Sequence, residues 1–495
     1  MRPDPASLSD RPRRRRRGWW AVLLPAAVLA GVSQYAGPRL AAAQDGEPDP
    51  TAAADSEAPA SARPSVRVAI GYDDARLRLG RGMPTGAGVA FAHVEGQPGR
   101  YAPDLQGPAY EGVAFSLRSG PSEPFAHATS TARVIYGSTG LAPGVEVVHC
   151  MTSAGFLGPL HLNAGTTAPP VTLADTKTPF PPRVFSHSWI GSPPDDQAAV
   201  VLRRVDHQID TRELVMCVGV NNGRHTPVPP LLASAYNVIA VGTADGNNSG
   251  GVTSLDVPGR VKPDLVAPWG PTSFTTPVAA AVAGLLVEQA DRLADAGHPT
   301  AGRSEVIKAA LLGGATKPDA WDASPDNQPL DRHLGAGMVN VDRALRILAA
   351  APLTPGDTFK RLFGWSAPTV ERGQTLSYSL ELPGDTGPAS FTLVWNRRID
   401  GRVAVGTRRD TGQRVGVWLD APRVADLDLR LVALADDGTE SVLARSVSRV
   451  DNVEHVHLPS LTQGTYRLEI VRDADHDPLD EPWDAALTWA IDKPQ

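Results

Sequence analysis

Between residues 66 and 350, short apolar runs of β type alternate with helical patterns, and this alternation leaves few fold classes open. Strands that alternate with helices form a parallel sheet with helices packed on its faces. We therefore expect an α/β domain of three layers over residues 65–350, with a mostly parallel central sheet. The expected strands cover residues 88–94, 145–148, 184–189, 214–220 and 238–241, and the clearest helices cover 277–296 and 304–312.

After Pro355 the hydrophobic period changes to two, as in half-buried strands. Turns rich in Gly and Asp, such as Asp436-Asp437-Gly438, separate these segments. The pattern predicts a second domain over residues 356–495, an all-β sandwich. Its tryptophans are expected in the core: Trp365, Trp395, Trp418, Trp483 and Trp489.

The first 64 residues have the composition of targeting and spacer segments. A basic block at residues 13–17 precedes an apolar run at 18–36, and Ala41-Ala42-Ala43 then precedes Gln44 as a signal-peptidase site. We expect a signal peptide at 1–43, a flexible linker at 44–64, and an exported mature chain without a membrane span. A retained membrane anchor is the alternative, because the apolar run is near the lower limit for spanning a bilayer.

Charge and cysteine usage exclude several classes of protein. The net charge of −7 argues against a general nucleic-acid binder, which carries basic patches in its folded part. Cys150 and Cys217 are the two cysteines of the chain, so it is neither a disulfide-stapled scaffold nor a cysteine-rich zinc module. Both follow or sit in strand-like runs, where buried free thiols are expected and a single disulfide is the alternative.

Ser273 lies directly ahead of a nearly all-apolar helical segment at residues 278–287. Backbone amides and the helix dipole favour negative charge at such a position, which suits a nucleophile. The alternative is that Ser273 only caps a core helix. The surrounding segments, Lys-Pro-Asp-Leu-Val-Ala-Pro at 262–268 and Thr272-Ser273 with Pro277, resemble the nucleophile region of subtilisin-like serine peptidases, with Pro271 in place of a glycine.

This resemblance implies a general-base histidine and an acid earlier in the chain. His127-Ala128-Thr129, followed by Gly-Leu-Ala-Pro-Gly at 140–144, is similar to the family's histidine segment, and an imidazole titrates near neutral pH. Glu95 stands where the family has its acid, both by counting from Gly88 and by its offset to the segment 102–105. It would orient His127 and stabilise the imidazolium. His93, on the same strand face, is the rival for an active-site contact.

Further positions follow from the same resemblance. Asn221 would occupy the oxyanion hole, with Val220 in place of a glycine, although adjacent asparagines before Gly223 also make an ordinary turn. Ser188, Trp189 and Gly191 would line the substrate cleft. The resemblance covers roughly residues 66–350.

We therefore expect an exported serine endopeptidase that hydrolyses protein or peptide substrates through an acyl-enzyme and needs no cofactor. One rival is a catalytically inactive scaffold of the same fold, favoured by the substitutions at the motif positions. Another is a serine-carboxyl peptidase that works at acidic pH.

The sequence does not decide whether the protein binds calcium. Asp473, Asp475 and Asp477 imitate the start of a calcium-binding loop, but Pro478 stands where that loop needs a glycine, so a solvated turn is expected. His455 and His457 share a strand face, and a surface pair is favoured over a metal site.

Overall fold

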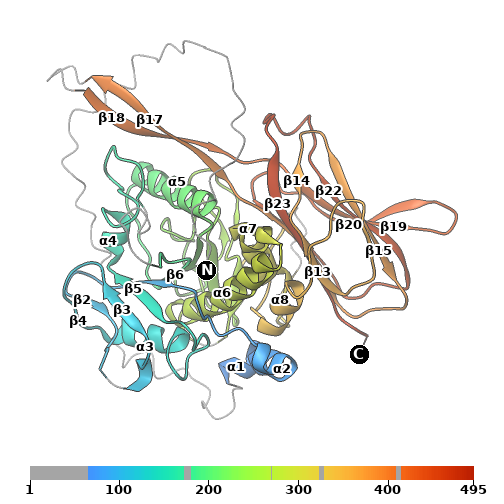
Figure 1. The fold of residues 1–495 in the computed structure, drawn as a ribbon. Coiled ribbons are helices and arrows are strands. Elements are labelled where there is room, and N and C mark those ends of the chain that lie inside the picture. Colours follow the sequence, from blue (N-terminus) through green and yellow to red (C-terminus); the bar gives the residue numbers. More distant parts are fainter. Residues whose placement is uncertain are drawn as a thin grey trace, which may run out of the picture.

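The computed structural model describes residues 65–106, 108–171, 180–268, 270–322, 328–407 and 414–494. The predicted signal peptide and linker lie outside these residues. An α/β part and a β-rich part lie side by side, and the predicted boundary falls between α8 (Val341–Ile347) and β12 (Thr358–Phe359) (Figure 1). No helix in the described segments is long and apolar enough to span a bilayer.

The α/β part is built on one seven-stranded sheet in the order β11-β8-β7-β6-β1-β5-β3, and each neighbouring pair is parallel. This confirms the prediction of a mostly parallel central sheet. All five predicted strands are present with slightly shifted ends. The strands are β1 (Phe91–Val94), β3 (Ala114–Leu117), β5 (Val147–Met151), β6 (Val184–His187), β7 (Val215–Gly219), β8 (Ile239–Thr243) and β11 (Leu265–Ala267).

Helices cover both faces of this sheet and complete three layers. The face that carries Phe91 packs against α3 (Ala126–Ile135), α6 (Thr272–Asp295) and α7 (Ser304–Gly313), whereas α5 (Asp195–Arg212) covers the face that carries Ala92. Helix α6 approaches the sheet so closely that a Cβ at Gly284 would lie 2.4 Å from the Phe91 ring. The shorter elements are α1 (Val66–Ala69), α2 (Tyr72–Leu79), α4 (Ser153–Leu157), β2 (Arg100–Ala102), β4 (Glu123–Pro124), β9 (Gly251–Val252) and β10 (Val261–Lys262).

The start of α6 differs from the sequence prediction. The helix begins at Thr272 rather than at Pro277, so Ser273 lies in its first turn and Pro277 lies inside it. The predicted start is too late because proline is common in the first turn of a helix, and the prediction places Pro277 in that turn. The predicted end is close, because the chain leaves the helix at Gly297 with a left-handed φ of 98°.

The C-terminal part is a sandwich of two sheets, as predicted. One has the order β12-β15-β22-β19-β20, and the other has the order β13-β23-β16-β21 with β14 paired to β23. Period-two apolar side chains of both sheets form its core. The strands are β13 (Phe363–Ser366), β14 (Thr369–Val370), β15 (Thr375–Leu382), β16 (Ala389–Trp395), β19 (Asp428–Leu434), β20 (Glu440–Ser446), β21 (Val453–Leu458), β22 (Gly464–Val471) and β23 (Trp483–Ile491).

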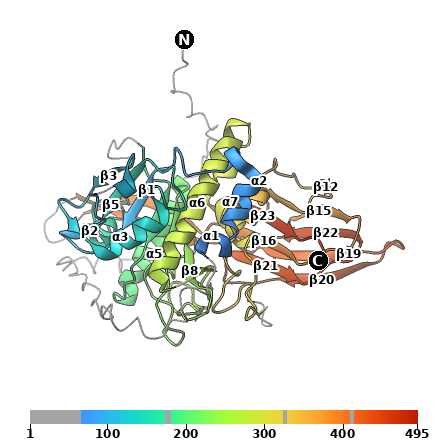
Figure 2. The ribbon, with the colours of Figure 1, turned by 90° about the horizontal axis from the view of Figure 1, so that it is seen from below.

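The two parts share a continuous interface. Helix α7 packs against β16 and β23, and Figure 2 shows α6 running between the α/β elements and the sandwich strands. A ribbon formed by β17 (Arg398–Thr407) and β18 (Arg414–Arg423) crosses to α5 (Figure 1). All five tryptophans are buried, but Trp418 lies on this ribbon against His207 of α5 and Trp365 joins the core of the α/β part.

Candidate active site

Three of the predicted site residues follow the carboxyl ends of neighbouring parallel strands. Glu95 follows β1, Ser188 follows β6, and Asn221 comes two residues after β7. Parallel strands end at the same edge of a sheet, and open α/β sheets bind ligands at this edge where the strand order reverses. In the sheet, β5 and β3 lie on one side of β1, and β6 and the later strands lie on the other side. The strand order therefore reverses at β1.

Glu95 and His127 are hydrogen-bonded. The Nδ1 atom of His127 lies 2.8 Å from Oε2 of Glu95. The Glu95 side chain is 3% exposed, whereas that of His127 is 31% exposed. His127 is the second residue of α3, and Ala128 beside it is fully buried. A buried carboxylate thus holds an imidazole that still reaches the surface of the domain.

Ser273 is half-buried in the first turn of α6, and α3 packs against this helix. The ring of Phe274, the next residue, lies 5.9 Å from the ring of His127. The structure therefore brings the first turns of the histidine helix and the serine helix together. Because Pro277 has no N–H for the Ser273 carbonyl, that oxygen accepts a hydrogen bond from Ser188 Oγ at 2.9 Å instead.

The asparagine side chain that contacts α6 is that of Asn222, which the sequence analysis did not select. Its Oδ1 accepts hydrogen bonds from the backbone N–H of Thr272 at 2.9 Å and from the Thr272 hydroxyl at 3.0 Å. Asn221 is held by its backbone, which exchanges hydrogen bonds with Ser249. The side chain of Asn221 is half-buried, and its oxyanion role stays a prediction.

The other residues predicted to line the cleft follow Ser188 along the chain. Trp189 is half-buried, and its Nε1 donates to Nδ1 of the buried His187 at 3.2 Å. Gly191 pairs with Leu231 through two backbone hydrogen bonds. Contact of these residues with substrate stays a prediction.

The Lys-Pro-Asp segment that precedes the serine helix has a structural role. Asp264 is buried, pairs with Lys262 at 2.7 Å and Lys308 at 3.1 Å, and accepts from the N–H of Ala240 in β8. Burial opposes the charge, but the two lysines outweigh it and hold the pKa of Asp264 below its usual range. Burial also lowers the pKa of Lys262 to about 8. These bonds fasten the chain just before β11.

Cys150 and Cys217 are buried free thiols, as predicted, and burial raises the pKa of each. Among the residues that the structure describes, no group of three His, Cys, Asp or Glu side chains is placed to hold a metal ion. The prediction of a solvated turn at residues 473–477 is wrong for Asp477, which is buried in an ion pair with Arg472 at 2.7 Å. His455 is likewise buried rather than on the surface, and contacts Lys317 and Thr392.

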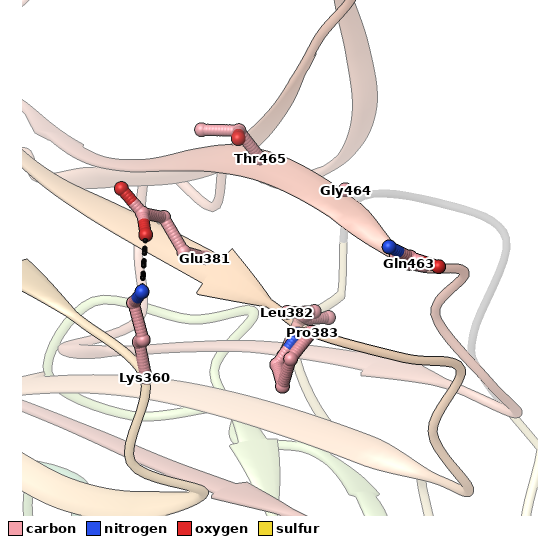
Figure 3. A pocket seen from close by; sticks show the side chains of 7 residues that line it. All are labelled: Lys360, Glu381, Leu382, Pro383, Gln463, Gly464 and Thr465. Carbon is pink, nitrogen blue, oxygen red and sulfur yellow. Dashed lines mark ion pairs between the residues drawn. The ribbon is translucent and has the colours of Figure 1, made fainter.

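A shallow pocket lies in the C-terminal domain, away from the residues above. It is lined by residues of β15, β22 and their neighbouring loops, with an ion pair of 3.0 Å between Lys360 and Glu381 at one side (Figure 3). Its lining has no nucleophile paired with a base.

No protein-family model and no curated protein sequence matches the chain. Among solved structures, proteases from Pseudoalteromonas arctica align with 14% identity over 55% of this chain and 94% of theirs, with a TM-score of 0.35. Fervidolysin from Fervidobacterium pennivorans, described as a keratinolytic enzyme related to subtilisin, aligns with 13% identity over 83% of this chain and 78% of its own, also with a TM-score of 0.35. Likeness at this level carries no functional weight.

Proposed function

We propose that this protein is a serine endopeptidase with Ser273 as nucleophile, His127 as general base and Glu95 as the acid that orients His127. One observation carries the proposal: a buried Glu95 carboxylate bonds Nδ1 of His127, while the same imidazole lies against Phe274, next to Ser273. When Nδ1 of a histidine donates to a carboxylate, Nε2 is the basic nitrogen of the ring, which is the arrangement that serine hydrolases use.

In the proposed reaction, Ser273 Oγ attacks the carbonyl carbon of a peptide bond as His127 takes its proton. Glu95 stabilises the resulting imidazolium. His127 then protonates the leaving amine, and the C–N bond breaks to leave an ester on Ser273. Water, deprotonated by His127, hydrolyses this ester and restores the serine.

Stabilisation of the oxyanion is assigned to the start of α6 and to Asn221. The helix dipole favours negative charge at the start of α6, and the backbone N–H of Ser273 is the first-turn amide that we assign to the oxyanion, because that of Thr272 donates to Asn222 and that of Phe274 donates to the Pro271 carbonyl. We assign the side-chain amide of Asn221 to the same oxyanion, supported by its place after β7 at the carboxyl edge of the sheet. Ser188, Trp189 and Gly191 would contact a protein or peptide substrate, and none of these steps calls on a cofactor. We further propose that the mature chain acts after export.

A fluorophosphonate probe, which forms a covalent bond with an activated serine, tests the proposal. We expect the full chain to be labelled and to cleave casein at neutral pH, and Ser273→Ala and His127→Ala to lose both activities. Ser138→Ala, at an exposed serine, is the matched control and should behave as wild type.

The rival functions give different results. Folded wild-type protein that is not labelled and does not cleave casein would support an inactive scaffold. Cleavage that survives His127→Ala and is greatest at acidic pH would support the serine-carboxyl mechanism.

A further inference from the structure

Glu95 differs from an aspartate by one methylene, and its carboxylate is held at both oxygens. Oε2 bonds His127, and Oε1 accepts a hydrogen bond from the Thr131 hydroxyl at 3.0 Å. The terminal torsion of a glutamate is broad, so a single bond to His127 would leave the head group free to turn. A second bond to the other oxygen fixes that torsion.

Thr131 is in turn supported by His93. Its Oγ1 lies 3.2 Å from His93 Nε2, and the other ring nitrogen of His93 lies 3.4 Å from the hydroxyl of Tyr136. His93 precedes Glu95 by two residues at the end of β1, so both side chains point to the face that α3 covers. Thr131 lies one turn after His127 on α3. All of these groups except His127 are buried.

The hydrogen bonds from Tyr136 through His93 and Thr131 to Glu95 can all be donated in the same direction. Burial lowers the pKa of His93 and raises that of Tyr136, so both are neutral near pH 7. Tyr136 O–H then donates to Nδ1 of His93, Nε2–H of His93 donates to Thr131, and Thr131 donates to Glu95. Several ionisable groups interact electrostatically with His93 or lie beside it: Glu95, His127, Tyr136, Cys150 and His187.

We infer that Thr131 and His93 are positioning residues that lock the Glu95 carboxylate against His127. The consequence for catalysis rests on the proposed function, but the positioning itself does not. His93, the predicted rival of Glu95 for an active-site contact, thus supports Glu95 through Thr131 instead.

A purely structural role for Thr131 is the competing explanation. Its Oγ1 also lies 3.0 Å from the carbonyl oxygen of His127 and 3.2 Å from that of Ala128, so its proton can bond the preceding turn of α3. The distances from Thr131 Oγ1 to Glu95 and to the His127 carbonyl are equal at 3.0 Å, but a carboxylate is the stronger acceptor, because a hydrogen bond to a charged group is about twice as strong as one between neutral groups. The two explanations differ in what happens to His127 when the hydroxyl is removed.

The test compares Thr131→Val, which removes the hydroxyl at nearly constant shape, with Thr131→Ser, which keeps it. Two readouts are used on the full chain: the maximal rate of fluorophosphonate labelling against pH, and the Nδ1–H proton resonance of His127 after histidine-selective 15N labelling. Thr211→Val is the matched control, since Thr211 on α5 makes the same bond to the preceding turn, with His207.

We expect Thr131→Val to slow maximal labelling by about tenfold or more, as for loss of a hydrogen bond to a charged group. The acidic limb of its pH profile should shift, and the His127 Nδ1–H resonance should move upfield and broaden through faster exchange with water. Thr131→Ser should restore both readouts, and Thr211→Val should leave them unchanged. His93→Leu should act like Thr131→Val, and His93→Gln, which keeps a donor to Thr131, should act less.

Each outcome has a distinct meaning. Wild-type labelling with an unchanged pH profile and resonance in folded Thr131→Val and His93→Leu overturns the inference and leaves the proposed function intact. An unlabelled wild type whose His127 resonance still responds to Thr131→Val overturns the proposed function and leaves the positioning role intact. If Thr131→Val does not fold, the contrast between His93→Leu and His93→Gln decides on the same two readouts.

Discussion

Ser188 Oγ donates a hydrogen bond to the backbone carbonyl of Ser273 at 2.9 Å, across the carboxyl edge of the sheet. Pro277 leaves this carbonyl without its helical partner, so the bond joins the strand-end segment after β6 to the first turn of α6. By freeing this carbonyl, the proline allows a hydrogen bond between Ser273, the proposed nucleophile, and Ser188 of the predicted cleft wall.

Ser188→Ala should lower the free energy of unfolding by about 1–3 kcal/mol, because it leaves a part-buried carbonyl without a partner. Pro277→Ala restores an N–H four residues after Ser273, so the double variant should lose less than Ser188→Ala alone. Urea unfolding of the two single variants and the double variant measures the coupling. Strict additivity of the two changes would contradict this role of the proline.

Glu95→Gln should reduce the maximal rate of fluorophosphonate labelling by about three to four powers of ten, the effect known for amide replacement of a triad acid. The amide keeps the shape but cannot stabilise an imidazolium, and it can hold His127 in the wrong tautomer. The unfolding midpoint should change little by comparison, which separates this loss from misfolding. A decrease of less than tenfold in a folded variant would remove Glu95 from the mechanism.

The sequence predicts the sheet well, because five of its strands are short apolar runs, and such a run is the main sequence signal of a buried strand. It predicts the pairing of Glu95 with His127 only through the resemblance of their segments to those of subtilisin-like serine peptidases. It does not predict the contact of Asn222 with Thr272, or the support of Glu95 by Thr131. These depend on how α3 and α6 sit on the sheet, which no local pattern specifies. The same holds for Trp418, whose neighbour on α5 is about 200 residues away in the chain.

Glu305 should make the protein less stable as the pH rises. Burial, with the nearby Glu213 as a second cause, raises the pKa of Glu305 from 4.5 to about 8. The folded state then binds more protons than the unfolded state between these values, so the free energy of unfolding falls as the pH rises from about 4.5 to about 8. Glu305→Gln keeps the shape and should flatten this slope, with its largest stabilisation near pH 8. Urea unfolding at pH 5, 6.5 and 8 measures the free energy of unfolding of both proteins. The same dependence of this free energy on pH in wild type and Glu305→Gln would contradict the prediction.

Arg397→Ala should destabilise the whole chain, because it breaks a buried ionic contact between the two domains. Its guanidinium lies 2.6 Å from both Asp206 on α5 and Asp256, and all three side chains are almost fully buried. Removing the cation leaves the buried Asp206 carboxylate without an ion pair and leaves Asp256 with its pair to Arg203 alone, at 2.9 Å, which costs about 3–5 kcal/mol. Arg398→Ala is the matched control: its ion pair with Asp484 is partly exposed, so a loss of about 1 kcal/mol or less is expected. Thermal unfolding should show one lowered transition for Arg397→Ala, since a shared core makes the domains unfold together. Two separate transitions would instead show that the sandwich and the α/β domain unfold independently.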